Sequence, residues 1–132
     1  MNKLLLVFHF MSLSIIGFAN SMVNIDSLEM VLKQYETAKN TEQTVEVLFQ
    51  IGNHYYNEQQ DSLAMLYMDK ALEQVMEEQK VLKGRLLYKK GMLVYFSGKD
   101  FEMAKRLFEE AKILYKNADT ESQFVFLILQ YI

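Results

Sequence analysis

"GNHYYNEQQDSLAMLYMDKAL", residues 52–72, decides the fold, because "GMLVYFSGKDFEMAKRLFEEA", residues 91–111, repeats its pattern. Ala64 and Ala71 in the first stretch are seven residues apart, so both lie on one face of a helix. The second stretch carries a pair of alanines with the same spacing at the equivalent positions. Small residues at fixed places let paired helices approach closely. The repeat therefore predicts two similar helix hairpins that stack, because one hairpin cannot bury its apolar face alone.

The rest of the chain has a helical pattern too. It contains no proline, and apolar residues after residue 25 recur at intervals of three and four, the period of an amphipathic helix. We expect an all-α fold with a leading helix over 26–39, a first repeat over 41–79, a second over 81–116 and an incomplete third over 120–132. Within the repeats, helices are expected over 41–57, 61–79, 81–97 and 100–116. The alternative is an ordinary helical bundle whose alanines are only good helix formers.

Local signals mark the helix ends. Asp26 with Glu29 has the capping-box pattern of a helix start. Asp61 and Asp100 are the expected N-caps of two later helices. Gly98 is expected to end a helix in the left-handed conformation.

At the repeated positions the chain resembles the tetratricopeptide repeat family, with the 40-residue spacing of kinesin light chains instead of the usual repeat of about 34 residues. The packing positions are Gly52, Tyr55, Ala64, Met68 and Ala71 in the first copy and Gly91, Phe101, Ala104, Phe108 and Ala111 in the second. The second copy is one residue longer between its glycine and its first alanine. Either its turn has an insertion, or Met92 takes the small-residue place.

The resemblance implies a short right-handed solenoid of antiparallel helix hairpins that binds a protein or peptide in a concave groove, without catalysis. The residues it places in that groove are Glu46, Phe49, Asn53, Tyr56, Arg85, Tyr88, Met92 and Tyr95. Aromatic side chains mixed with amide and charged groups are typical of peptide-binding surfaces. The alternative for each residue is packing against a neighbouring helix.

The residues offer little for catalysis. His54 is the one histidine after residue 21, and with Glu58 one turn away it falls short of the three or four ligands of a zinc site. Adjacent carboxylates such as Glu109 and Glu110 diverge by about 100° around a helix and cannot act on one bond. The chain has no cysteine. We therefore expect no enzyme activity, no metal and no cofactor; an enzyme remains the least favoured alternative.

The N-terminal segment has the pattern of a secretory signal peptide over residues 1–21: Lys3, an apolar run over 4–18 and then Ala19-Asn20-Ser21. The run is shorter than the roughly 20 residues of a membrane-spanning helix. We expect export to the periplasm, or a membrane anchor if the segment is not cleaved. The leading segment is also similar to periplasmic repeat arrays of Bacteroidota signalling proteins. The alternative function is thus the sensory input region of a truncated histidine kinase or helix-turn-helix regulator.

Removal of residues 1–21 leaves 13 basic and 17 acidic side chains, a formal charge of 13 − 17 = −4. Such a surface is a poor match for nucleic acid. The basic residues between positions 80 and 90 are interpreted as one solvated helix face. They are Lys80, Lys83, Arg85, Lys89 and Lys90.

The chain ends in "TESQFVFLILQYI", residues 120–132. Its apolar run is too short to span a membrane, and a repeat array normally closes with a helix whose outer face is polar. We expect this segment to begin a third repeat and to favour self-association.

Overall fold

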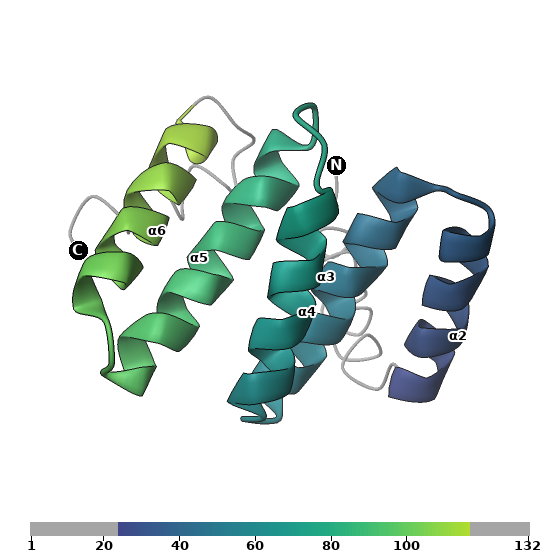
Figure 1. Ribbon diagram of the computed structural model, residues 1–132, viewed down its shortest axis with the longest axis horizontal. Coiled ribbons are helices and arrows are strands. Elements are labelled where there is room, and N and C mark those ends of the chain that lie inside the picture. Colours follow the sequence, from purple (N-terminus) through teal and green to yellow (C-terminus); the bar gives the residue numbers. More distant parts are fainter. Residues whose placement is uncertain (1–23, 117–132) are drawn as a thin grey trace, which may run out of the picture.

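The computed structural model describes residues 24–116, and in this range the chain is all helical (Figure 1). The helices are α2 (Ile25–Thr37), α3 (Thr41–Asn57), α4 (Asp61–Gln74), α5 (Lys80–Ser97) and α6 (Phe101–Tyr115). Each helix packs against the next one along the chain. The predicted all-α class is confirmed for these residues. The expected signal segment and the apolar segment at 120–132 lie outside the described residues.

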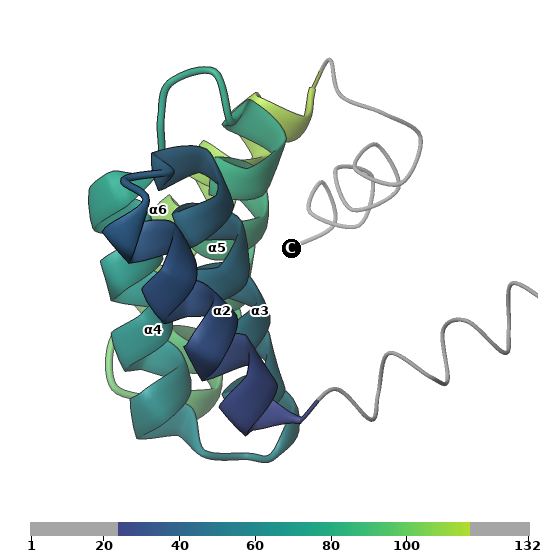
Figure 2. The ribbon, with the colours of Figure 1, turned by 90° about the vertical axis from the view of Figure 1, so that its right-hand side faces the viewer.

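The helices form two layers. Figure 2 shows α3 and α5 on one side of the molecule and α4 on the other. Two hairpins result, α3 with α4 and α5 with α6, and α2 packs against α3. Met65 and Leu72 of α4 contact both hydrophobic clusters of the core. They therefore join the two hairpins.

The helix starts differ in part from the expected ones. Asn24, and not Asp26, caps α2: its Oδ1 accepts the Asp26 backbone N–H at 3.0 Å. Asp61 is the first residue of α4 and does not cap it, since the N-cap is Gln60, which makes no side-chain cap bond. A helix begins where the backbone turns helical, and an acidic residue in the first turn also suits the helix dipole. Asp100 does cap α6, as predicted.

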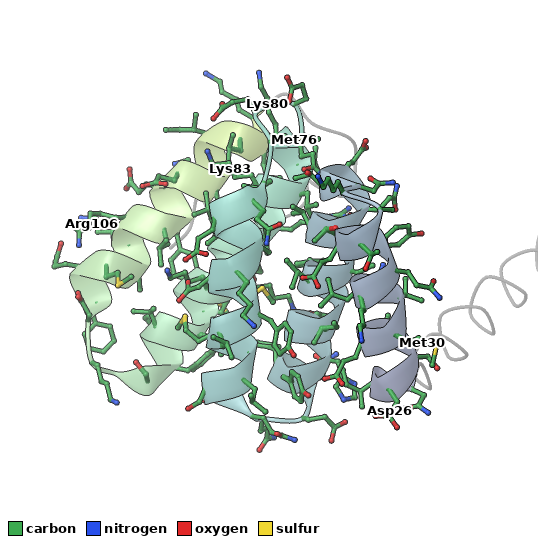
Figure 3. All side chains as sticks on the ribbon, turned by 45° about the vertical axis from the view of Figure 1, so that its right-hand side comes forward. Asp26, Met30, Met76, Lys80, Lys83 and Arg106 are labelled. Atoms are coloured by element: carbon green, nitrogen blue, oxygen red, sulfur yellow. The ribbon has the colours of Figure 1, made fainter. Side chains whose placement is uncertain are left out.

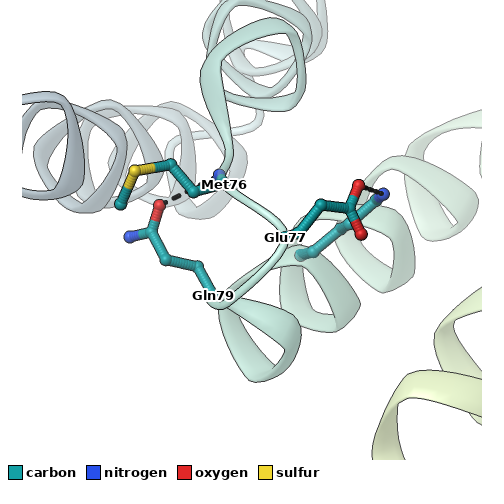
Figure 4. Close-up of polar contacts among 4 residues, drawn as sticks. Met76, Glu77 and Gln79 are labelled. Atoms are coloured by element: carbon teal, nitrogen blue, oxygen red, sulfur yellow. Dashed lines mark hydrogen bonds and ion pairs between the residues drawn. The ribbon is translucent and has the colours of Figure 1, made fainter.

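The connection between the hairpins begins earlier than predicted. Val75 is extended, with φ −59° and ψ 131°, so α4 ends at Gln74 and not near Gln79. Side-chain bonds organise the connection that follows (Figure 4). Gln79 accepts the Met76 backbone N–H at 3.2 Å and donates to the carbonyl of Glu42, at the start of α3, at 3.3 Å. The bond to Glu42 ties the connection to the first hairpin.

The turns after α2 and α3 share one conformation. Lys39 and Gln59 each adopt a left-handed backbone, with φ of 54° and 57°. The next amide, on Asn40 or Gln60, bonds to a carbonyl five residues back, at 3.0 or 2.9 Å. This is the Schellman pattern, which usually carries glycine. The turn after α5 has the predicted glycine, Gly98, with φ 67°.

The core contains the repeated small residues. The alanines are fully or almost fully buried; they are Ala64, Ala71, Ala104 and Ala111. A Cβ atom on Gly52 would lie 3.0 Å from the Met68 side chain, and one on Gly91 would lie 2.7 Å from the Phe108 ring. Each glycine thus faces the large residue of its own hairpin.

These contacts decide between the two interpretations of the longer second copy. Gly91 is buried and takes the small-residue place, while Met92 is partly exposed. The turns before α4 and α6 each have three residues, 58–60 and 98–100. The extra residue therefore lies near the end of helix α5, and the connection between α5 and α6 has no insertion.

Two aromatic residues expected at packing positions behave differently. Tyr55 is partly buried against the core and stacks on Tyr67 of α4, with ring centroids 5.6 Å apart. Phe101 is 59% exposed, so its prediction as a packing residue was wrong. It is the first residue of α6, and its ring contacts Tyr95 edge-on across the turn.

Candidate functional site

The eight predicted groove residues fall into two groups. Phe49 and Tyr56 of α3 are partly buried against a core cluster that contains Leu86 of α5. Two of the four predicted residues on α5 pack instead against the cluster formed by α5 and α6; they are Tyr88 and Met92. The structure therefore divides these four residues between the two clusters of the core.

The remaining four predicted residues lie at different positions along α3 and α5. Glu46 and Arg85 are partly exposed and belong to the first halves of α3 and α5. Asn53 is partly exposed and belongs to the second half of α3. Tyr95 lies near the end of α5 and is 46% exposed. Its ring contacts Phe96 and Phe101, with centroids 5.5 and 5.6 Å away, and so belongs to the α5–α6 turn.

The aromatic ring of Tyr56 on α3 contacts the basic group of Lys89 on α5. The Lys89 Nζ lies 4.4 Å from the centroid of the Tyr56 ring, a distance that allows cation–π attraction. Sequence reasoning placed Lys89 on a solvated face and missed this role. The sequence indicates this role only by position. Lys89 is the residue after the predicted groove residue Tyr88, and in the structure it lies on the side of α5 that faces α3.

Burial shifts the pKa of both Tyr56 and Lys89. Burial raises the pKa of the Tyr56 phenol above its usual value, and Tyr88 and Asp61 raise this pKa further. Burial lowers the pKa of the Lys89 amine. In both cases removal of water disfavours the charged form. A ligand carboxylate beside Lys89 would restore stabilisation of the ammonium ion.

An open cleft of about 440 Å³ lies beside Tyr56, where the ends of α3 and α5 meet. Its walls combine two apolar residues with a phenol, two amides and a carboxylate; they are Leu93, Phe96, Tyr56, Asn57, Gln59 and Asp61. Phe96 is 69% exposed and was not predicted as a site residue. A few polar groups around apolar walls are typical of ligand pockets.

Asn53 adds an unpaired acceptor. Its Oδ1 atom is buried and, among the described residues, has no hydrogen-bond donor. Asp69 Oδ1 also lacks a hydrogen bond but lies 2.6 Å from Lys90 Nζ as an ion pair. A buried acceptor without a donor is costly.

We call the surface around these groups the α3–α5 face: Phe49, Asn53, Tyr56, Lys89, Leu93 and Phe96. It offers aromatic surface, one amine and amide groups for binding. His54 makes an edge contact with the neighbouring Tyr55. Within residues 24–116 there is no group of three side chains suited to hold a metal ion. The same stretch contains no helix long and apolar enough to cross a membrane.

Comparisons with known proteins found no similar protein. The resemblance to tetratricopeptide repeats therefore depends on the repeated residues and on the packing described above, and it stays a prediction. No protein-family model, curated protein or solved structure matches this chain.

Proposed function

We propose that this chain is an exported tetratricopeptide-type scaffold that binds a peptide or protein segment on the α3–α5 face and has no catalytic activity. The observation that carries the proposal is the joint between the hairpins, where Tyr56 and Phe96 line one cleft and the Lys89 amine lies over the Tyr56 ring. The signal pattern of residues 1–21 supports export.

The packing of the hairpins supports the repeat assignment. Both hairpins oppose a glycine of the first helix to a large residue of the second: Gly52 to Met68 and Gly91 to Phe108. An ordinary bundle has no reason to use the same contact twice. The repeated contact favours two copies of one structural unit.

The α3–α5 face suits an extended peptide better than a compact ligand. The cleft is open, and its polar groups differ in kind. The Lys89 amine can pair with a carboxylate, and the Asn57 and Gln59 amides of the cleft can bond to a peptide backbone. Phe96 and Leu93 provide apolar surface for one side chain. Such a mixture binds peptides through a few anchors.

Selection from a random peptide library against the purified chain tests this function. We expect peptides whose affinity falls at least tenfold, or about 1.4 kcal/mol, on Lys89→Glu or on Phe96→Ser. Truncation of an anchor residue in a binding surface commonly costs this much. Affinity can be measured by calorimetry.

Arg106→Ser is the matched control, because Figure 3 shows Arg106 on α6 pointing away from the other helices. This variant should bind the selected peptides as the unchanged chain does. Unfolding midpoints of all variants should agree, so that lost binding reflects the surface. Failure to select any peptide, or equal loss on Arg106→Ser, would contradict the proposal.

A further inference from the structure

Two adjacent lysines of α5 reach the two different helices of the first hairpin. The Lys89 Nζ lies 4.4 Å from the centroid of the Tyr56 ring on α3. The Lys90 Nζ lies 2.6 Å from Oδ1 of Asp69 on α4. Successive residues of a helix point about 100° apart, so the two contacts lie on different sides of α5. Both therefore depend on how α5 is rotated about its own axis.

The contact between Asp69 and Lys90 is partly shielded from water. The Lys90 side chain is 17% exposed and the Asp69 side chain is 43% exposed. The Asp69 Oδ1 atom itself is buried, and among the described residues no hydrogen bond reaches it. The ammonium group of Lys90 therefore supplies the compensation that this oxygen needs. A rotation of α5 that separated the two groups would leave a buried charge unpaired, which is costly.

The apolar packing of α5 is less selective. Leu82, Leu86 and Leu93 pack in the cluster that α5 shares with α3 and α4. Leu87 and Val94 pack in the cluster that it shares with α6. A helix that is apolar on two sides loses little when it rotates by part of a turn, because apolar contact is not directional. Apolar packing alone thus leaves the rotation of α5 weakly determined.

The repeat itself does not require a charge at this place. Lys90 corresponds to Ile51 of the first copy, since each precedes the small glycine of its hairpin, and Ile51 is fully buried. On α4, Asp69 shares one side of the helix with Met65 and Leu72, which join the two hairpins. The ion pair thus stands in a joint where apolar residues would also fit. Replacing a buried ion pair by apolar residues is often neutral or stabilising, so stability alone does not account for the pair.

We infer that Asp69 and Lys90 are positioning residues for the α3–α5 face. Their ion pair fixes the rotation of α5 against α4, and this rotation holds the Lys89 amine over the Tyr56 ring. Without the pair, α5 takes several rotations, and the amine leaves the ring in most of them. The position of Lys89 can be measured without a ligand; only the consequence for binding rests on the proposed function.

Nuclear magnetic resonance of the full chain tests the position of Lys89. Protons held over an aromatic ring resonate upfield, so the methylene protons next to the Lys89 amine should be displaced upfield, and Tyr56→Leu should abolish this displacement. Asp69→Leu combined with Lys90→Ile removes both charges and places the residue of the first copy on α5. This double variant should lose most of the displacement, while its urea midpoint stays at or above that of the unchanged chain.

Two controls separate the ion pair from a general loosening of α5. Lys90→Arg keeps the pair and should keep the displacement. Glu77→Leu combined with Lys83→Ile removes a second ion pair of α5, in which the charged atoms lie 3.8 Å apart and the glutamate is 91% exposed. It should also keep the displacement. The inference is overturned if the displacement is absent from the unchanged chain, survives the first double variant or disappears in either control. A lower urea midpoint of the first double variant would overturn it as well, by assigning the pair to stability.

Binding supplies a second measurement, which rests on the proposed function. Lys89→Glu should weaken the selected peptides about tenfold in the unchanged chain, but less than about threefold when Asp69→Leu and Lys90→Ile are also present, because the amine then has no fixed place. An equal loss in both backgrounds would contradict the positioning role. Failure to select any peptide would contradict the proposed function instead, and the resonance measurement would still decide the inference.

Discussion

The two hairpins place a glycine opposite a large residue in the same way, but with different tolerance. In α3–α4 the partner of Gly52 is the flexible thioether end of Met68; in α5–α6 the partner of Gly91 is the rigid ring of Phe108. A methionine end can move aside, whereas a ring fixed between two helices cannot. The same small residue is therefore useful in one hairpin and required in the other.

The hairpins also differ in their turns. The α3–α4 turn uses Gln59 in the left-handed conformation, and the α5–α6 turn uses Gly98. A side chain in this conformation costs about 1–2 kcal/mol, which glycine avoids. The first hairpin is thus strained at its turn and tolerant in its core, and the second shows the reverse.

Replacing each of the two glycines by alanine should show the largest difference in stability between the hairpins. A Cβ on Gly91 would lie 2.7 and 2.9 Å from two atoms of the Phe108 ring, so Gly91→Ala should lower the free energy of unfolding by about 1–3 kcal/mol. Gly52→Ala should change it by less than about 1 kcal/mol, because the 3.0 Å contact is with the movable end of Met68, the Tyr67 Cβ lies at 3.3 Å, and alanine favours the helix. Urea unfolding measures both.

Phe108→Leu combined with Gly91→Ala is the control for the cause of this loss. The smaller side chain makes room for the new Cβ, so the double variant should lose less than the sum of the two single variants. Equal losses for Gly91→Ala and Gly52→Ala would mean that ring rigidity does not distinguish the hairpins.

Substitutions in the turns should have opposite signs. Gly98→Ala should lower the free energy of unfolding by about 1 kcal/mol, because alanine is strained at the positive φ of this residue. Gln59→Gly should raise it by about 0.5 kcal/mol, since relief of strain exceeds the extra entropy of glycine in the unfolded chain. Thermal unfolding reports both, with the exposed Lys99→Ala as a neutral control. A loss in stability on Gln59→Gly would contradict this account.

The smallest expected effect is alkaline sensitivity at the joint between the hairpins. Burial raises the pKa of Tyr56, so above pH of about 10 the folded chain keeps a proton that the unfolded chain loses. Stability should therefore fall as pH rises through this range. Tyr56→Phe should make the fall shallower, which urea midpoints between about pH 9 and 11 can show. An unchanged slope would mean that the phenol is not held in its neutral form.

Tyr67 on α4 allows the same test between α2 and α4. Burial also raises the pKa of Tyr67 on α4, and Glu29 and Glu36 of α2 raise it further through their charges. Tyr67→Phe should likewise make the alkaline loss shallower. Because Glu29 and Glu36 contribute at Tyr67, its effect should depend more on salt than the effect at Tyr56.

The helices themselves were readable from the sequence where the signal is local. The helix of residues 41–57 begins and ends as predicted, Gly98 has the left-handed backbone, and Asp100 caps α6. The four alanines are buried because a fixed spacing places them on one helix face. Each of these features depends on a few neighbouring residues and on helix geometry, which a sequence states directly.

The site was decided by tertiary structure. Phe101 and Phe108 look alike in the sequence, yet Phe101 is exposed and Phe108 is buried. Phe108 faces Gly91 of α5, whereas Phe101 lies at the start of α6 beside Tyr95. Lys89 reads as one of several basic residues until α5 packs beside α3 and sets its amine over Tyr56. Periodicity determines which face of a helix is apolar, but contact between helices determines which aromatic side chains are covered and which remain free to bind.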